Sequence, residues 1–95
     1  DVEGALHQLP QVLEACAFSV PDDRLGETVG AVVQLREGTT LTRAQMAQAL
    51  DGHLATFKTP THLWCQHSPL MRGATDKIDR RGLRTACLEK LEART

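Results

Sequence analysis

The pattern of apolar and polar residues predicts short helices alternating with short strands. Apolar residues recur at helical spacing over positions 2–9, and Pro10 ends that helix. The apolar run 12–20 predicts a well-buried strand, which Pro21-Asp22-Asp23 stops. The next segment, Leu25-Gly26-Glu27, has the composition of a loop.

The middle of the chain predicts a second strand and a capped helix. Residues 28–36 alternate between apolar and polar, which indicates a half-buried strand, with Val32 as the exception. A turn at 37–40 follows, and Thr42 with Gln45 forms a capping box. The inward residues of the helix are Met46, Ala49, Leu50 and Leu54, and it ends before Thr59-Pro60.

The last third predicts a strand, a loop and a helix. The strand covers 62–67, Ser68-Pro69 breaks it, and the helix begins near Arg80 with Asp79 as its N-cap. The inner face of that helix consists of Leu83, Cys87 and Leu91. The order of elements predicts an α+β fold with a small, mostly antiparallel three-stranded sheet covered by helices.

Composition narrows the class of protein. A chain of 95 residues with net charge −1 is one domain without the basic excess typical of nucleic-acid binding, so we expect no nucleic acid partner. No apolar run approaches the roughly 20 residues of a transmembrane segment. Three cysteines without CxxC spacing indicate free thiols and a cytoplasmic location. Because Asp1 opens within a helical pattern and no Met precedes it, we expect a fragment of a larger protein.

Other reactive side chains have structural explanations. His62, Cys65 and His67 could suggest zinc, but strand alternation places His62 on the opposite face from the other two, so we expect no metal site. Cys16 and Cys87 are expected to be small core residues.

The chemistry is concentrated in residues 72–81. Gly73 frees the backbone, Thr75 adds a hydroxyl group, and Lys77 comes directly before a helix start. Lysine is a compact, mobile charge suited to phosphate or carboxylate, and loops often carry such functional groups.

This stretch resembles the C-terminal signature of the adenylate-forming (AMP-binding) superfamily, approximately P-x-x-x-T-G-K-[IV]-x-R. The matching residues are Thr75, Lys77, Ile78 and Arg80. Met71 stands where proline is common, and Asp76 stands where the family has glycine. Aspartate adds a negative charge beside Lys77 and tolerates positive φ less well than glycine.

Three other segments carry the same resemblance in the same order. Residues 1–6 resemble the segment that follows the family's hinge region, and 54–60 are similar to L-x-x-[FY]-K-x-P. Residues 20–27 resemble V-P-D-x-x-x-G-E, which is typical of acyl-CoA synthetases and favours a fatty-acid–CoA ligase type over a peptide-synthetase domain.

The resemblance implies that residues 1–95 are one C-terminal lid domain. The hinge and the large N-terminal domain, which binds ATP, Mg²⁺ and a small-molecule carboxylic acid, would lie outside this chain. The whole enzyme would be an ATP-dependent carboxylate–CoA ligase that makes an acyl-adenylate and then the CoA thioester. The residues implied are Lys77 as catalytic, Thr75 and Gly73 near ATP or the adenylate, and Gly26 and Glu27 on the CoA face. We expect the isolated chain to fold but to bind none of ATP, Mg²⁺ or CoA and to be inactive.

Two alternatives stay open. The domain could belong to an adenylation enzyme that loads a carrier protein, or it could be a degenerate, non-catalytic interaction module. The second alternative stays open because Asp76 replaces the family's glycine beside Lys77. Arg80 and Arg81 begin a helix, where cations oppose the helix dipole. That placement suggests pairing with Asp76 or Asp79, or contact with the large domain.

Overall fold

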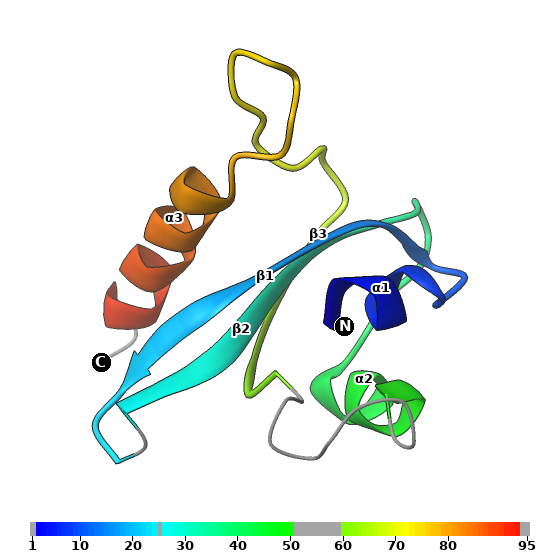
Figure 1. Cartoon of the computed structure of the whole chain (residues 1–95). Coiled ribbons are helices and arrows are strands. Elements are labelled where there is room, and N and C mark those ends of the chain that lie inside the picture. Colours follow the sequence, from blue (N-terminus) through cyan, green and yellow to red (C-terminus); the bar gives the residue numbers. More distant parts are fainter. Residues whose placement is uncertain (1, 25, 51–59, 94–95) are drawn as a thin grey trace.

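The computed structural model describes residues 2–24, 26–50 and 60–93. Within them the chain forms three helices and three strands (Figure 1). In chain order these are α1 (Val2–His7), β1 (Val12–Asp22), β2 (Gly26–Leu35), α2 (Arg43–Leu50), β3 (His62–Gln66) and α3 (Arg80–Ala93). No helix in these ranges is long and apolar enough to cross a membrane.

The strands form one sheet in the order β1-β2-β3. β1 and β2 are antiparallel, with Ala17 opposite Ala31, and β3 runs parallel to β2, with Trp64 opposite Val32. A parallel neighbour needs a long crossover, and the segment that contains α2 provides it. The expected three-stranded α+β architecture is confirmed, and the sheet is mixed, with the antiparallel ladder the longer one.

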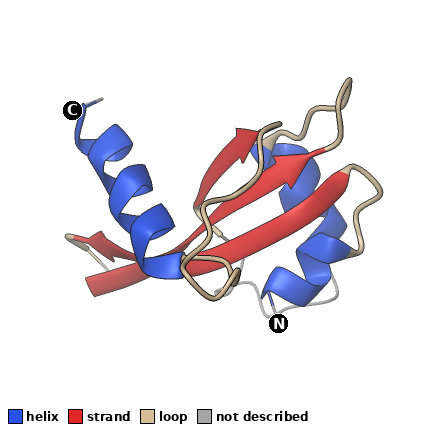
Figure 2. Cartoon of the chain, turned by 90° about the horizontal axis from the view of Figure 1, so that it is seen from above, coloured by secondary structure: helices blue, strands red, loops and turns tan. Residues whose placement is uncertain are grey.

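Helices cover both faces of the sheet. α1 and α2 lie on one face and α3 lies on the other (Figures 1 and 2). The buried residues of the first layer are Leu6, Val12, Ala15, Ala31, Val33, Leu35, Leu41, Met46 and Leu50. Those of the second are Cys16, Phe18, Val20, Val32, Leu70, Leu83 and Cys87. The second layer explains why Val32 breaks the predicted alternation of apolar and polar residues. Val32 is buried on the α3 side, so β2 is buried on both faces rather than half-buried.

Gly30 lies in β2 beneath a pair of aromatic rings. The rings of Phe18 and Trp64 are stacked with centroids 5.8 Å apart. A Cβ atom at Gly30 would lie 2.7 Å from Val20 Cγ2 and 3.0 Å from Trp64 Cζ3. The centre of the sheet therefore has no room for a side chain at this position.

The predicted helix starts are confirmed. The Gln45 amide donates to Thr42 Oγ1 over 3.1 Å, and the Thr42 amide donates to Gln45 Oε1 over 3.0 Å, which is the reciprocal capping box. At α3 the Gly82 amide donates to Asp79 Oδ1 over 3.0 Å, so Asp79 is the N-cap. Leu54 and the predicted helix end at Thr59 lie outside the described residues.

The first hairpin is longer than the sequence indicates. β1 continues through Pro21 to Asp22, and β2 begins at Gly26, so Gly26 and Glu27 are strand residues rather than a loop. β1 is an edge strand of the described sheet, where the missing N–H of proline costs no ladder bond. Gly26 adopts φ 80°, a left-handed conformation that lets the chain reverse at the first pair of the ladder, Asp22 with Gly26.

Candidate functional site

The lysine-bearing segment forms a second, much smaller hairpin, the Lys77 hairpin (residues 71–79). Arg72 and Ile78 form an antiparallel bridge. The Gly73 amide donates to the Lys77 carbonyl over 2.8 Å, and the Asp79 amide donates to the Met71 carbonyl over 2.8 Å. The Lys77 segment is therefore an ordered hairpin whose second strand leads directly into α3.

The conformation of the hairpin tip explains how Asp76 can stand where the family has glycine. The Asp76 amide donates to the Gly73 carbonyl over 3.0 Å, which closes a four-residue turn, and Asp76 itself has φ 63°. A turn followed by a left-handed residue is the three-residue hairpin loop with a G1 bulge, where glycine is favoured. Aspartate is among the few other residues that adopt this conformation. Asp76 therefore takes the backbone conformation that glycine would take.

Lys77 projects from an anchored base. Leu70 is buried and Ile78 is packed against the same core layer beneath α3. Side chains alternate along an extended segment, so Lys77 points away from the core that holds Ile78. Lys77 is exposed, and among the described residues no hydrogen bond or ion pair engages its amine. Within the described residues, therefore, the amine has no partner that a ligand would have to displace.

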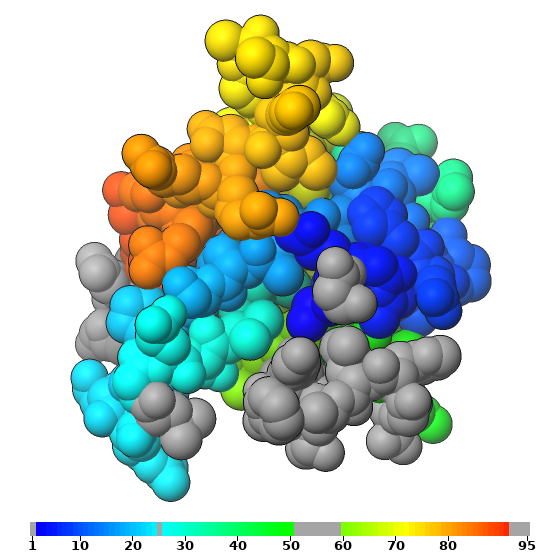
Figure 3. Space-filling view, viewed as in Figure 1, coloured from blue at the N-terminus to red at the C-terminus, as the bar shows by residue number. Residues whose placement is uncertain are grey.

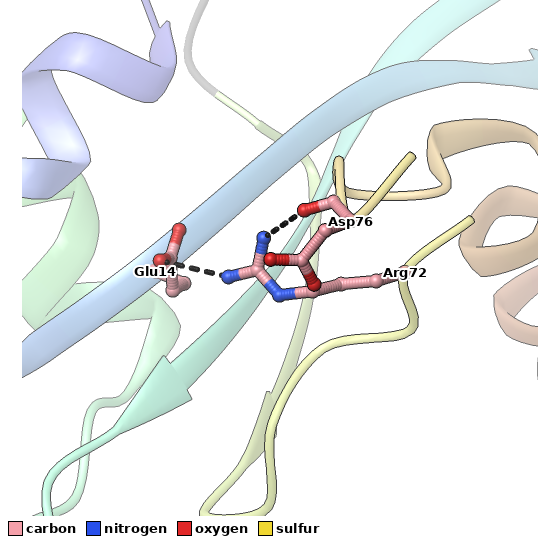
Figure 4. Close-up of polar contacts among 3 residues, drawn as sticks. All are labelled: Glu14, Arg72 and Asp76. Carbon is pink, nitrogen blue, oxygen red and sulfur yellow. Dashed lines mark hydrogen bonds and ion pairs between the residues drawn. The ribbon is translucent and has the colours of Figure 1, made fainter. Parts of the chain in front are cut away.

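Arg72 ties the hairpin to the sheet. Its Nη2 atom lies 3.1 Å from Glu14 Oε1 on β1, and its Nη1 atom donates to the Asp76 carbonyl over 3.0 Å (Figure 4). The two side chains are only about one-third exposed, at 37% for Arg72 and 33% for Glu14. One guanidinium therefore connects β1 to the peptide group that joins Asp76 to Lys77.

The remaining predicted site residues fall at two separate places. Gly73 and Thr75 are exposed on the same hairpin as Lys77. Gly26 and Glu27, which are also exposed, belong to the turn end of the β1–β2 hairpin. Figures 1 and 3 show the two hairpin tips projecting from different ends of the molecule, yellow to orange for the Lys77 hairpin and cyan for the other.

A second arginine joins the two helical layers around the edge of β1. Arg80 Nη2, from α3, lies 2.7 Å from Glu3 Oε2 on α1, and that carboxylate also accepts the Ala17 amide over 2.7 Å. Arg80 therefore pairs with Glu3 rather than with Asp76 or Asp79. Burial of Glu3 acts to raise its pKa, but the bonds from Ala17 and Arg80 outweigh it, so the pKa of Glu3 lies below its usual value.

The three cysteines are free thiols, two of them buried and Cys65 exposed. Cys16 and Cys87 are buried as expected, and burial raises the pKa of the Cys16, Cys65 and Cys87 thiols. The Cys65 thiol donates to the Leu41 carbonyl. Within the described part of the chain, no group of three or more His, Cys, Asp or Glu side chains could hold a metal ion.

Sequence reasoning overlooked the side chains that hold the hairpin. Glu14 and Arg72 are 58 residues apart, and Glu3 and Arg80 are 77 residues apart. Neither pair belongs to a local motif, because the first forms only when β1 meets the Lys77 hairpin and the second only when α1 meets α3. The sole signal in the sequence was the position of Arg80 at a helix start, where a cation opposes the helix dipole and an acidic partner is therefore expected.

The fold and the exposed lysine hairpin define a small α+β domain of the kind that ends adenylate-forming enzymes. Residues 1–74 match the AMP-binding enzyme C-terminal domain, and the chain belongs to this family. The match ends just before Thr75, so it does not include Lys77.

Related sequences and solved structures agree with this family match. The chain is 38% identical over 81 residues to oxalate–CoA ligase of Saccharomyces cerevisiae, covering 85% of this chain and 15% of that enzyme. It is 42% identical over 64 residues to 3-oxocholest-4-en-26-oate–CoA ligase of Rhodococcus rhodochrous, covering 67% of this chain and 12% of that enzyme. The structure of apo MatB from Rhodopseudomonas palustris superposes with a TM-score of 0.82 and 34% identity, over 90% of this chain and 17% of MatB.

The chain thus spans about one-seventh of the length of these curated relatives. It corresponds to their small C-terminal part. The expected resemblance to CoA ligases is confirmed.

Proposed function

We propose that the full-length protein is an ATP-dependent carboxylate–CoA ligase and that this domain is its mobile C-terminal lid, with Lys77 as the catalytic residue. The observation that carries the proposal is the placement of Lys77 on an ordered, anchored hairpin in a domain of this family, with no partner for its amine among the described residues. The partners follow from it: the large N-terminal domain of the same protein, a carboxylic acid, ATP and CoA.

In the first step, a carboxylate oxygen of the acid forms a bond to the α-phosphorus of ATP. The bond from that phosphorus to the pyrophosphate oxygen breaks, which gives an acyl-adenylate and pyrophosphate. Negative charge builds on the phosphoryl oxygens, and a cation in a closed site of low dielectric stabilises it far better than water does. Lys77 supplies that cation when the lid closes, with Thr75 and Gly73 beside it on the same hairpin.

In the second step, the sulfur of CoA attacks the acyl carbon of the adenylate. The bond from that carbon to the AMP oxygen breaks, the thiol proton is lost, and the thioester and AMP are formed. Lys77 has no task in this step and has to withdraw. Gly26 and Glu27 belong to the turn end of the β1–β2 hairpin, and that tip projects from a different end of the domain than the Lys77 hairpin (Figure 1), so a rotation of the lid would exchange one tip for the other at the active site.

Magnesium belongs to the rest of the proposed enzyme. The described residues gather no cluster of carboxylates or other ligands for a cation, so we assign the ion to the large domain and derive no step through it. Three unpaired cysteines are consistent with a cytoplasmic enzyme.

A carrier-protein-loading enzyme is the second candidate, because adenylation is common to both and only the thiol acceptor differs. The non-catalytic module is less well supported. Asp76 adopts the left-handed conformation suited to the hairpin tip, and among the described residues it forms no ion pair with Lys77.

The test uses the full-length protein and separates the two steps. ATP–pyrophosphate exchange would be followed with oxalate, octanoate or 3-oxocholest-4-en-26-oate, and thioester formation would be followed from supplied acyl-adenylates of the same acids. Lys77→Ala should lower exchange by roughly 100-fold or more and leave thioester formation within a few-fold. The matched control is Lys90→Ala, an exposed lysine on α3.

The outcomes discriminate between the candidates. Exchange that survives Lys77→Ala would contradict a catalytic role for this residue. Normal exchange with transfer only to a phosphopantetheine-bearing carrier would favour the second candidate. No exchange with any of the three acids would count against a CoA ligase for these acid classes.

A further inference from the structure

The Lys77 hairpin has few side chains to hold its tip in place. Residues 71–77 are all exposed, and the buried anchors, Leu70 and Ile78, lie at its base. The tip residues Gly73, Ala74 and Thr75 are too small to pack against the sheet. A separate contact is needed to fix the direction in which the tip points.

Arg72 supplies that contact from inside the hairpin. Its guanidinium spans two fixed acceptors, Glu14 Oε1 at 3.1 Å and the Asp76 carbonyl at 3.0 Å (Figure 4). Glu14 is attached to the sheet because it belongs to β1, where it pairs with Gln34 in the antiparallel ladder. The planar fork of arginine can hold both acceptors at once, whereas the single ammonium of lysine is less suited to this.

The second acceptor makes this contact functional. The Asp76 carbonyl belongs to the peptide group that precedes Lys77, and Asp76 is the residue in the left-handed conformation. A rotation of this peptide would redirect the Cα–Cβ bond of Lys77. The Arg72 bond opposes such a rotation at the place where the backbone is least favoured for a residue other than glycine.

We infer that Arg72, anchored by Glu14, is a positioning residue that orients Lys77 for the adenylation step. The inference rests on the proposed function and adds to it a residue pair outside the signature lysine. Arg72 acts through the backbone of Asp76. Loss of the tie should therefore affect the step that uses Lys77 and spare the step that does not.

The first measurement needs no substrate. Site-resolved amide hydrogen exchange on the full-length protein should show faster exchange at Gly73 and Asp76 in Arg72→Ala and in Glu14→Ala, because both amides close the hairpin. The control is Arg84→Ala, which removes another arginine-to-backbone bond, from Nε to the Ser19 carbonyl, away from the hairpin. Unchanged exchange at both amides would overturn the inference.

The second measurement follows the two half-reactions in the same variants. Arg72→Ala should lower kcat for ATP–pyrophosphate exchange by about 10- to 100-fold, with KM for ATP and for the acid shifted by less than roughly threefold. Thioester formation from supplied acyl-adenylate should match wild type. Adding Glu14→Ala to Arg72→Ala should cause little further loss, because the two act as a unit.

The results separate the inference from the function on which it rests. If Lys77→Ala abolishes exchange while Arg72→Ala behaves like Arg84→Ala, the enzyme assignment stands and the positioning role is wrong. If Arg72→Ala slows both half-reactions equally, the arginine is merely structural and the inference fails. If Lys77→Ala itself has no effect, the proposed function fails first, and the positioning role fails with it.

Discussion

The two hairpins of this domain are held together in opposite ways. The β1–β2 hairpin lies between helices, and side chains such as Leu35, Val33 and Val20 bury both of its faces. The Lys77 hairpin is short and exposed, and it depends on backbone hydrogen bonds and on Arg72. We therefore expect the β1–β2 hairpin to be sensitive to the loss of buried side-chain volume and tolerant of polar substitutions at its surface. We expect the Lys77 hairpin to be sensitive to the loss of its polar contacts and tolerant of changes in side-chain volume.

This difference suits their proposed roles. A framework that carries a catalytic group must not deform when that group contacts its ligand, and dense packing provides the necessary rigidity. A catalytic lysine must stay accessible, so it cannot be held by burial. Hydrogen bonds to the backbone fix its direction without covering its amine.

The largest effect is expected in the packed hairpin. Leu35→Ala should lower the free energy of unfolding of the 95-residue chain by about 2–5 kcal/mol, because Leu35 is 2% exposed and its removal leaves a cavity. Urea unfolding followed by circular dichroism measures the change. The control is Leu13→Ala in β1, since Leu13 is 38% exposed and should cost well under about 1 kcal/mol. Equal losses would refute the two-layer core.

A smaller effect is expected at the tip of the exposed hairpin. Asp76→Val should destabilise by about 1–2 kcal/mol, because a β-branched residue is poorly suited to φ 63°, whereas Asp76→Gly should be neutral or slightly stabilising. The same unfolding measurement applies. Thr75→Val is the matched control at a neighbouring position without positive φ. A loss in Asp76→Gly as large as in Asp76→Val would contradict the left-handed conformation.

The smallest effect is expected at Glu3, which joins the helical layers without belonging to either hairpin core. Its pKa is lowered in the folded state, so its contribution is complete above the unfolded pKa of about 4.3 and is lost as pH falls through the folded value. Glu3→Gln should therefore cost about 1 kcal/mol at pH 7 and progressively less below about pH 4. Urea unfolding across this pH range, with exposed Glu89→Gln as control, provides the check. A gap between wild type and Glu3→Gln that widens toward acid would contradict the assigned sign.

The sequence predicted most of the elements because their determinants are local. Apolar spacing marked α3, and the caps at Thr42 and Asp79 marked helix starts, since each cap is completed within three residues. The extension of β1 through Pro21 could not be predicted locally. It depends on β1 being an edge strand, which is a property of the whole sheet.

The residues of the candidate site likewise divide into those that local sequence could predict and those that meet only in the folded domain. Lys77, Thr75 and Gly73 lie together on one hairpin because they are neighbours in sequence, and their motif was visible for that reason. The partner of Arg72 was not visible, because Glu14 meets it only across the folded domain. Asp76 stood out as a departure from glycine, but its left-handed backbone became clear only from the hydrogen bonds of the turn.

The Glu3 carboxylate has a consequence beyond the folding of one molecule. β1 is the edge of the described sheet, and its outward N–H groups could template a strand from another chain. Glu3 occupies the Ala17 N–H and places a negative charge there, with Arg80 alongside. An approaching strand would have to displace a carboxylate that already satisfies this donor. At Ala17, therefore, the edge of the described sheet has no unsatisfied donor to offer a strand from another chain.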